Sequence, residues 1–225
     1  MAGQQQAPQR KQLPFDDQRM KLYANPAQGG TKRPTLTFGY VTRKFVANMA
    51  SITVRTQVPN DKNNGVIKAE IPMASMYSIF ETVKEILALP GAQERSRRLY
   101  TDFLMGKKTD QPVPYANLII GKEEDGRLYI ALVSKNRPNI KFHVAPDDFI
   151  REVTRDGQEM NTVEYYAQYG RGYFGLIADV YAWCVNSEFI GWSPDGGNGG
   201  NGGNGGNNNW GGGNNNGGNG GGNLS

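Results

Sequence analysis

The chain has 225 residues with 25 Lys and Arg against 21 Asp and Glu, and it contains one histidine and one cysteine. A single cysteine excludes an internal disulfide framework and a multi-cysteine zinc site, and a single histidine excludes metal sites that need two histidines. No catalytic constellation is evident and no apolar stretch is long enough to cross a bilayer, so we expect a cytoplasmic protein that is not an enzyme and has no cofactor, metal or membrane contact.

Composition divides the chain into three parts. Residues 1–33 are rich in Gln and Pro and carry six basic against two acidic side chains, which predicts a disordered basic arm. Residues 196–225 are Gly and Asn apart from Trp210 and the final Leu-Ser, which predicts a disordered tail. Residues 34–195 suit one domain with its own core. Because the arm accounts for the whole net charge of +4, the remainder of the chain is neutral and any basic surface on the domain must be local.

Three antiparallel strands are predicted at the start of the domain. Residues 35–41, 51–56 and 66–71 alternate apolar with polar side chains, as strands with one buried face do. The Asn and Gly residues within 61–65 tolerate the positive φ of a tight turn between the second and third strands.

A helix is predicted to follow these strands. Ser75 is a favoured N-cap residue, and apolar side chains from Met76 to Leu87 recur at the spacing of one helical face. Pro90 and Gly91 are typical of a helix end.

The second half of the domain begins with a basic connector over residues 91–116. A hairpin over 118–133 and a strand over 140–144 follow. A short helix from Asp147 to about Gly157 is expected next, and then a packing helix over 162–185 that contains glycines.

A repeat relates the two halves. Ile67-Lys68 and Ile140-Lys141 both open a strand that follows a strand and a polar turn, and both strands lead through a proline to an expected helix. A duplicated sheet-plus-helix unit of this kind would present one wide pleated face.

Basic and aromatic side chains alternate away from the expected core on these strands. Cations follow phosphates while rings stack on bases, so this mixture favours single-stranded nucleic acid. The candidate binding residues are Arg43, Lys44, Arg55, Lys68, Tyr129, Lys141 and His143.

The segment from Gly170 to Leu176 matches two patterns. It satisfies GxGxxG, but no strand follows it, so a nucleotide site is not expected. It also nearly matches the aromatic strand motif of RNA recognition motifs with two positions transposed. Tyr173 and Phe174 are therefore candidates for base stacking, and packing in the core is the alternative.

The strand, turn, strand and helix order over residues 35–156 resembles the PC4/Whirly group of single-stranded DNA-binding proteins, which includes phage-encoded members. That resemblance implies two units of four strands and a helix, although three strands per unit are clear here and Val41–Met49 would have to contribute to a fourth. The alternative fold is an OB barrel built from 35–41, 51–57, 66–71, the helix at 75–89 and the hairpin at 118–133.

Both folds predict a sequence-tolerant single-stranded DNA-binding protein that protects single strands in replication or recombination. We expect a viral protein, for which the cytoplasm would be that of the host. RNA is the alternative nucleic acid, and a nucleocapsid-like or scaffold protein is the alternative class. We also expect a homo-oligomer. The tail resembles the Gly-rich tails of other single-stranded DNA-binding proteins, which implies that it recruits replication or recombination proteins, although the acidic tip common in those tails is absent.

Overall fold

The computed structural model describes residues 12–27, 30–43, 46–104, 107–146 and 150–188. These residues form an α+β fold of two antiparallel four-stranded sheets and two α-helices, in which four strands and a helix are followed by four strands and a second helix. Neither of the helices in the described chain combines the length and apolar character that crossing a membrane requires. The tail expected over 196–225 lies outside the described residues.

The first sheet, called sheet 1, has the order β1-β2-β3-β4. Its strands are β1 (Leu22–Tyr23), β2 (Thr35–Arg43), β3 (Val46–Arg55) and β4 (Val66–Pro72). The three strands expected from the alternation are confirmed. Of the region Val41–Met49, residues 41–43 lengthen β2 and residues 46–49 lengthen β3, and the fourth strand is β1 instead.

The helix α1 (Met73–Ala88) follows β4 directly. It begins two residues before Ser75, and Pro72 stands at the N-cap position without a side-chain hydrogen bond, so the predicted cap is wrong. The apolar stripe is confirmed, since its buried side chains are Met76, Ile79, Phe80, Val83, Ile86 and Leu87.

The second sheet, sheet 2, has the order β5-β6-β7-β8. Its strands are β5 (Gln93–Leu104), β6 (Lys107–Lys122), β7 (Leu128–Val133) and β8 (Phe142–Val144). The expected connector over 91–116 is therefore mostly strand. The hairpin over 118–133 pairs with β5 and β8 and not with the first three strands, so the described residues do not form the alternative OB barrel.

The helix α2 (Thr162–Glu188) ends the described chain and matches the expected packing helix. The short helix expected from Asp147 is not found in the described residues that follow position 149. An isolated bridge joins Val153 to Glu159 there, across a turn at Gly157 with a φ of +79°. Asp147 itself lies outside the described residues.

The strand registers support the repeat. Ile52 pairs with Ala69 in sheet 1, and Ile130 pairs with Phe142 in sheet 2. Equivalent positions on the outward faces are then Lys68 and Lys141, Glu70 and His143, Ser51 and Tyr129, and Gly39 and Gly121.

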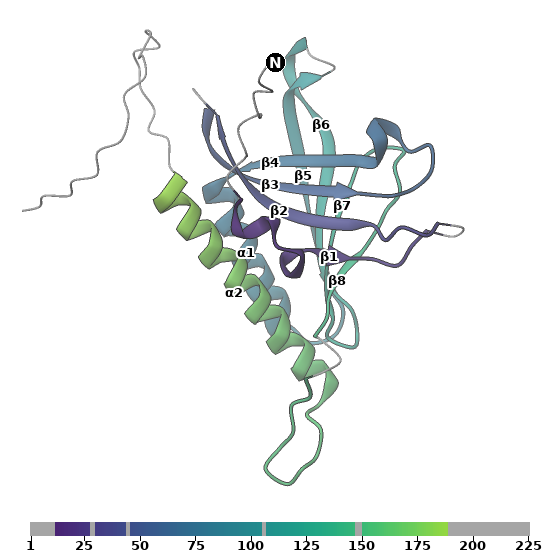
Figure 1. Cartoon of the computed structure of the whole chain (residues 1–225), viewed down its shortest axis with the longest axis vertical. Coiled ribbons are helices and arrows are strands. Elements are labelled where there is room, and N and C mark those ends of the chain that lie inside the picture. Colours follow the sequence, from purple (N-terminus) through teal and green to yellow (C-terminus); the bar gives the residue numbers. More distant parts are fainter. Residues whose placement is uncertain (1–11, 28–29, 44–45, 105–106, 147–149, 189–225) are drawn as a thin grey trace, which may run out of the picture. The chain divides into compact units, whose positions relative to one another are not determined.

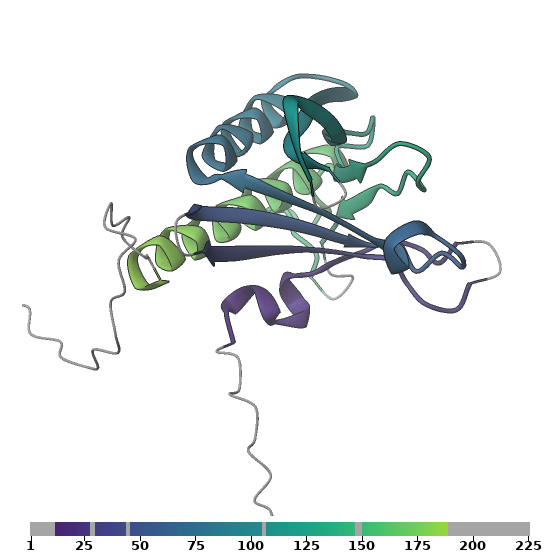
Figure 2. The ribbon, with the colours of Figure 1, turned by 90° about the horizontal axis from the view of Figure 1, so that it is seen from above.

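The strands of sheet 1 run across those of sheet 2 (Figure 1), so the outward side chains lie on two faces and not on one wide face. The helices α1 and α2 lie side by side (Figures 1 and 2). α1 contacts β3, β4, β5 and β6, while α2 contacts β2, β7 and β8. The inward faces of both sheets and both helices share one hydrophobic core.

The N-terminal segment is part of this core, which corrects the expectation of a disordered arm for its described residues. Two 3₁₀ turns, η1 (Pro14–Asp16) and η2 (Gln18–Met20), precede β1. Phe15 is only 3% exposed and its ring centroid lies 4.6 Å from that of Tyr181 on α2. Leu22 is also buried. Residues 1–11, with the cations Arg10 and Lys11, lie outside the description.

A buried ion pair joins the two units. Nη2 of Arg137, in the turn between β7 and β8, lies 2.6 Å from Oδ2 of Asp61, just before β4. Nη1 of Arg137 donates to the carbonyl oxygen of Val66 at 3.0 Å, and the hydroxyl of Thr56 donates to Asp61. The Arg137 guanidinium is the main reason that the pKa of Asp61 is lowered.

Candidate nucleic-acid interface

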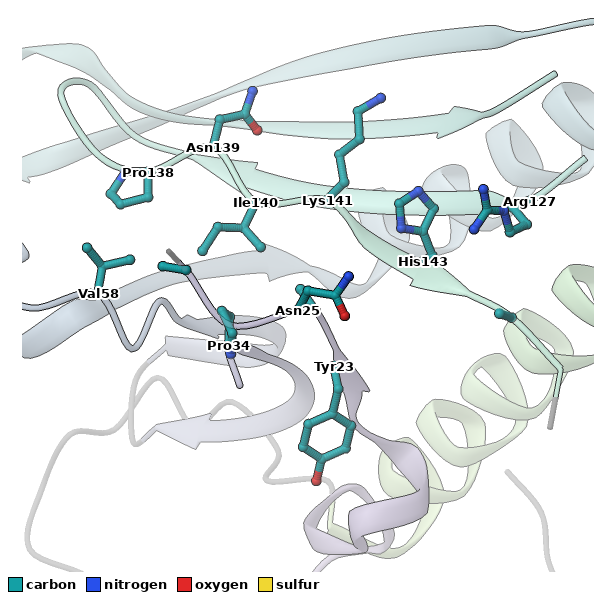
Figure 3. A pocket seen from close by; sticks show the side chains of 13 residues that line it. Tyr23, Asn25, Pro34, Val58, Arg127, Pro138, Asn139, Ile140, Lys141 and His143 are labelled. Carbon is teal, nitrogen blue, oxygen red and sulfur yellow. The ribbon is translucent and has the colours of Figure 1, made fainter. Parts of the chain in front are cut away.

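A hollow of about 580 Å³ lies where β1 approaches β8 (Figure 3). Sheet 2 contributes Lys141 and His143 to its wall, together with Arg127 just before β7. The facing wall comes from the segment around β1, where Tyr23 and Asn25 lie. The hollow therefore brings together two predicted binding residues, Lys141 and His143, with residues that the sequence placed in a separate arm.

A second hollow of about 250 Å³ adjoins the first and shares Tyr23, His143 and Ala145 with it. It adds three cations from the N-terminal segment, which are Arg19, Lys21 and Arg33. Cζ of Arg33 lies 5.2 Å from the centroid of the Tyr23 ring, an arrangement that holds a cation over an aromatic face.

A third hollow of about 300 Å³ lies on the outward face of sheet 1 and shares Lys21 with the second. Two of its lining residues, Arg55 on β3 and Lys68 on β4, are predicted binding residues. The strand alternation turns both away from the core, beside the hydroxyl side chains of Thr37 and Thr53. We call the three adjoining hollows the basic cleft.

The lining of the basic cleft is strongly biased in charge. It contains seven Lys and Arg residues, with Asp16 as the one acidic residue: Arg19, Lys21, Arg33, Arg55, Lys68, Arg127 and Lys141. Within the described chain Lys21, Arg33 and Arg55 form no ion pair. Three of the seven come from residues 1–33, which carry the net charge of the chain, and the cleft joins them to four cations of the neutral remainder. Such a local concentration of positive charge favours binding of a polyanion.

The other four cations form ion pairs with carboxylates next to the cleft. Lys68 pairs with Glu70 at 2.8 Å and Lys141 pairs with Glu123 at 2.9 Å. Arg19 and Arg127 likewise pair with Asp17 and Asp125, each at 2.6 Å. These pairs are solvent-exposed on at least one side, so each stabilises the fold little and its cation is available to a phosphate.

Two of these carboxylates carry shifted pKa values. The hydrogen bond from Lys141, with a smaller one from His143, lowers the pKa of Glu123. Hydrogen bonds from Arg19 lower the pKa of Asp17 to about 2. Both carboxylates are therefore ionised at neutral pH and hold their partners in place at the rim of the cleft.

Tyr129 is on the outward face of sheet 2, as predicted, but its ring is covered. The ring lies against Gly121, where an added Cβ would collide with it. On the ring, Nζ of Lys141 lies 4.1 Å from the centroid and makes a cation–π contact. The Tyr129 hydroxyl donates to Glu94 at 2.6 Å, and the residue is 4% exposed. Its burial raises the pKa of the phenol. In this arrangement the ring offers no open face to a base.

Tyr173 and Phe174 belong to α2, as the expected packing helix requires, so the near match to the RNA-recognition strand motif does not mark a strand. Phe174 is buried against Phe38 and Phe80, and packing in the core is its role. Tyr173 is half-buried beside the second hollow, and its hydroxyl donates to the carbonyl oxygen of Met20 at 3.0 Å. The glycines of the same segment are helical, so they form no phosphate-binding loop.

The two remaining candidates are at the end of β2. Arg43 is its last residue, and Lys44 lies outside the described residues. Sequence reasoning missed Arg19, Lys21, Tyr23 and Arg33, because they were assigned to the arm. The apolar residues Phe15 and Leu22 among them were the available signal that this segment docks on the domain.

Across the part of the chain that the structure describes, no three His, Cys, Asp or Glu side chains come together to hold a metal ion. Comparisons with protein-family models, with curated proteins and with solved structures found no match to this chain.

Proposed function

We propose that the protein binds single-stranded DNA in a sequence-tolerant way and protects it in replication or recombination. The observation that carries this proposal is the basic cleft, with seven Lys and Arg residues against one Asp in its lining. A more apolar hollow of about 410 Å³ lies between α1 and α2, but its lining has two basic and two acidic side chains and so lacks this bias in charge. The basic cleft is open along two sheets and the N-terminal segment.

The chemistry of the cleft suits a strand better than a small ligand. Its cations are spread over three adjoining hollows, so they would meet successive phosphates of one backbone. Tyr23, partly exposed between Arg33 and the first hollow, supplies a ring on which a base could stack.

The fold supports the same proposal. The PC4/Whirly group that the sequence resembles is expected to have two units of four strands and a helix, and this chain has that order of elements. We propose membership of that group on the basis of this order and of the strand registers that relate the two units.

Titration of fluorescent oligonucleotides at several salt concentrations tests the function. Poly-dT should bind more tightly than duplex DNA of equal length, and the affinity should fall steeply with salt because phosphate contacts release counterions. Equal affinity for duplex, or no binding of poly-dT at low salt, would refute the proposal. A parallel titration with poly-U decides between DNA and RNA.

Lys68 and Lys84 provide a matched pair of variants. Both are exposed lysines bonded to a neighbouring glutamate, at 2.8 and 2.7 Å, but Lys68 lies in the basic cleft and Lys84 on α1. Lys68→Ala should weaken binding and reduce the slope of log affinity against log salt by about 1, because one phosphate contact is lost. Lys84→Ala should leave both unchanged.

A homo-oligomer is part of the proposal. Leu176 and Trp183 on α2 are 50% and 45% exposed, and exposed apolar side chains of this size favour self-association. Sedimentation velocity measures it. Self-association in the absence of any affinity for nucleic acid would favour the alternative of a structural or assembly protein.

A further inference from the structure

The β5–β6 hairpin extends beyond the rest of sheet 2. β7 pairs with β6 only between Asn117 and Lys122, so β6 before Asn117 pairs with β5 alone. The result is a two-stranded ribbon that reaches past the ends of the other strands (Figure 1). We call this part the β5–β6 ribbon. It contributes little to the core, so its length and composition need a reason other than folding.

Two aromatic side chains on this ribbon are open to solvent. Tyr100 is 55% exposed and Phe103 is 57% exposed. Exposing rings of this size forgoes the free energy of burying them, and such positions commonly mark binding sites. The backbone between the two rings is held in place, because the hydroxyl of Thr101 donates to the carbonyl oxygen of Phe103 and accepts from its N–H, each at 3.1 Å. These bonds stabilise the shift in strand register between Thr101 and Phe103, and such irregularities change the direction in which side chains point.

The charges near these rings favour a polyanion. Lys107 and Lys108 on the ribbon, and Arg98 at its base opposite Asn117, are exposed and form no ion pair within the described chain. Asp102 and Asp110 on the ribbon are also exposed and balance its two lysines, so the excess positive charge lies at the base.

The base of the ribbon forms a hollow of about 470 Å³ with the turn after β7. Arg98, Lys135 and Tyr115 line it, together with Arg137, whose guanidinium is engaged by Asp61. No Asp or Glu belongs to the lining of this hollow. The ribbon and its base thus combine cations that form no ion pair with rings that are more than half exposed, whereas the Tyr23 ring in the basic cleft has Arg33 over one of its faces.

We propose that the β5–β6 ribbon and the hollow at its base form a second contact site for single-stranded nucleic acid. Tyr100 and Phe103 stack on bases, while Arg98 and Lys135 hold the phosphates that lead toward them. The inference rests on the proposed function and adds a separate site to it. The basic cleft holds one stretch of the strand and the ribbon holds another, so the occupied length is greater than the cleft alone would cover.

Binding of oligo-dT of increasing length tests this site in the full-length chain. The double variant Tyr100→Ala/Phe103→Ala should bind short oligonucleotides as the wild type does, and longer ones at least about fivefold more weakly, since each lost stacking contact costs about 1–3 kcal/mol. Tyr100→Trp/Phe103→Tyr, which keeps two rings, should restore the affinity. Ile150→Ala removes an apolar side chain that is 65% exposed and lies outside the basic cleft and the ribbon, and it should change nothing.

Cross-linking gives an independent readout of the same site. Oligonucleotides with 5-iodouracil should cross-link to Tyr100 or Phe103 on irradiation, as located by mass spectrometry. Wild-type affinity of the double variant at every length, or its altered sedimentation without nucleic acid, would overturn the ribbon site and leave the basic cleft intact. Failure of the wild type to bind any oligonucleotide would refute the proposed function and the ribbon site with it.

Discussion

Replacing Arg137 by methionine tests how the two units are held together. Arg137→Met keeps much of the stem of the side chain and removes its charge, so Asp61 is left buried with Thr56 as a remaining hydrogen-bond donor. The side chains of Asp61 and Arg137 are 3% and 8% exposed, so the carboxylate is poorly solvated once the guanidinium is removed. Breaking one side of a buried ion pair typically costs about 3–5 kcal/mol, and the bond to the Val66 carbonyl is lost as well. We expect a loss in that range.

Urea unfolding, followed by circular dichroism and fluorescence, measures this loss. The double variant Asp61→Asn/Arg137→Met contains no unpaired buried charge, so it should be more stable than Arg137→Met alone, with a coupling free energy of about 1–3 kcal/mol. Lys84→Ala breaks an exposed pair whose partners are each 66% exposed, and it should cost less than about 1 kcal/mol.

Two results would refute this reasoning. A loss of less than about 1 kcal/mol for Arg137→Met would show that Asp61 is solvated when its partner is removed. Equal stability of Arg137→Met and the double variant would show that the charge of Asp61 is not what destabilises the protein.

Three further predictions use the same unfolding assay. Phe15→Ala should cost about 3–5 kcal/mol because the ring is buried in the core, and a loss below about 1 kcal/mol would mean that the N-terminal segment is not docked. Arg137 lowers the pKa of Asp61 in the folded protein below the value of about 3.9 that the carboxyl has in the unfolded chain. The stability that the pair contributes should therefore be full above about pH 5 and be lost as the pH falls through the lower folded pKa. Asp61→Asn should make this loss of stability with falling pH shallower. Gly121→Ala should cost about 1–3 kcal/mol by displacing the ring that lies on it, whereas Gly172→Ala in open space on α2 should stabilise by up to about 1 kcal/mol.

Strands with one buried face were predictable and strands without one were not. β2, β3, β4 and β7 show apolar residues at core positions in the sequence, and they were found. β5 is a polar edge strand whose side chains are mostly exposed, so it carries no alternation to detect. Prolines at positions 112 and 114 also argued against a strand, but they lie in the ribbon, where β6 pairs with β5 alone.

The same logic explains which part of the candidate site was predictable. Alternation correctly turned Arg55, Lys68 and Lys141 away from the core, because it depends only on the period of a strand. It could not show that Lys141 covers the ring of Tyr129, since that contact is made between neighbouring strands. The cations around β1 were missed because their position depends on the packing of Phe15 against the core. The composition of a short, mostly polar segment does not show that one of its apolar residues is packed in this way.

The two units match inside and differ at two of the four equivalent outward positions, where Ser51 corresponds to Tyr129 and Glu70 to His143, while Lys and Gly recur at the other two. The core retains an approximate internal symmetry, with aliphatic or aromatic residues at equivalent inward positions, while the outward faces present different chemistry. A nucleic-acid strand has a direction from its 5′ to its 3′ end. Two identical halves related by a twofold axis would accept that direction either way, whereas diverged halves distinguish the two orientations. On the function proposed above, the diverged positions therefore give the two directions of a bound strand different contacts.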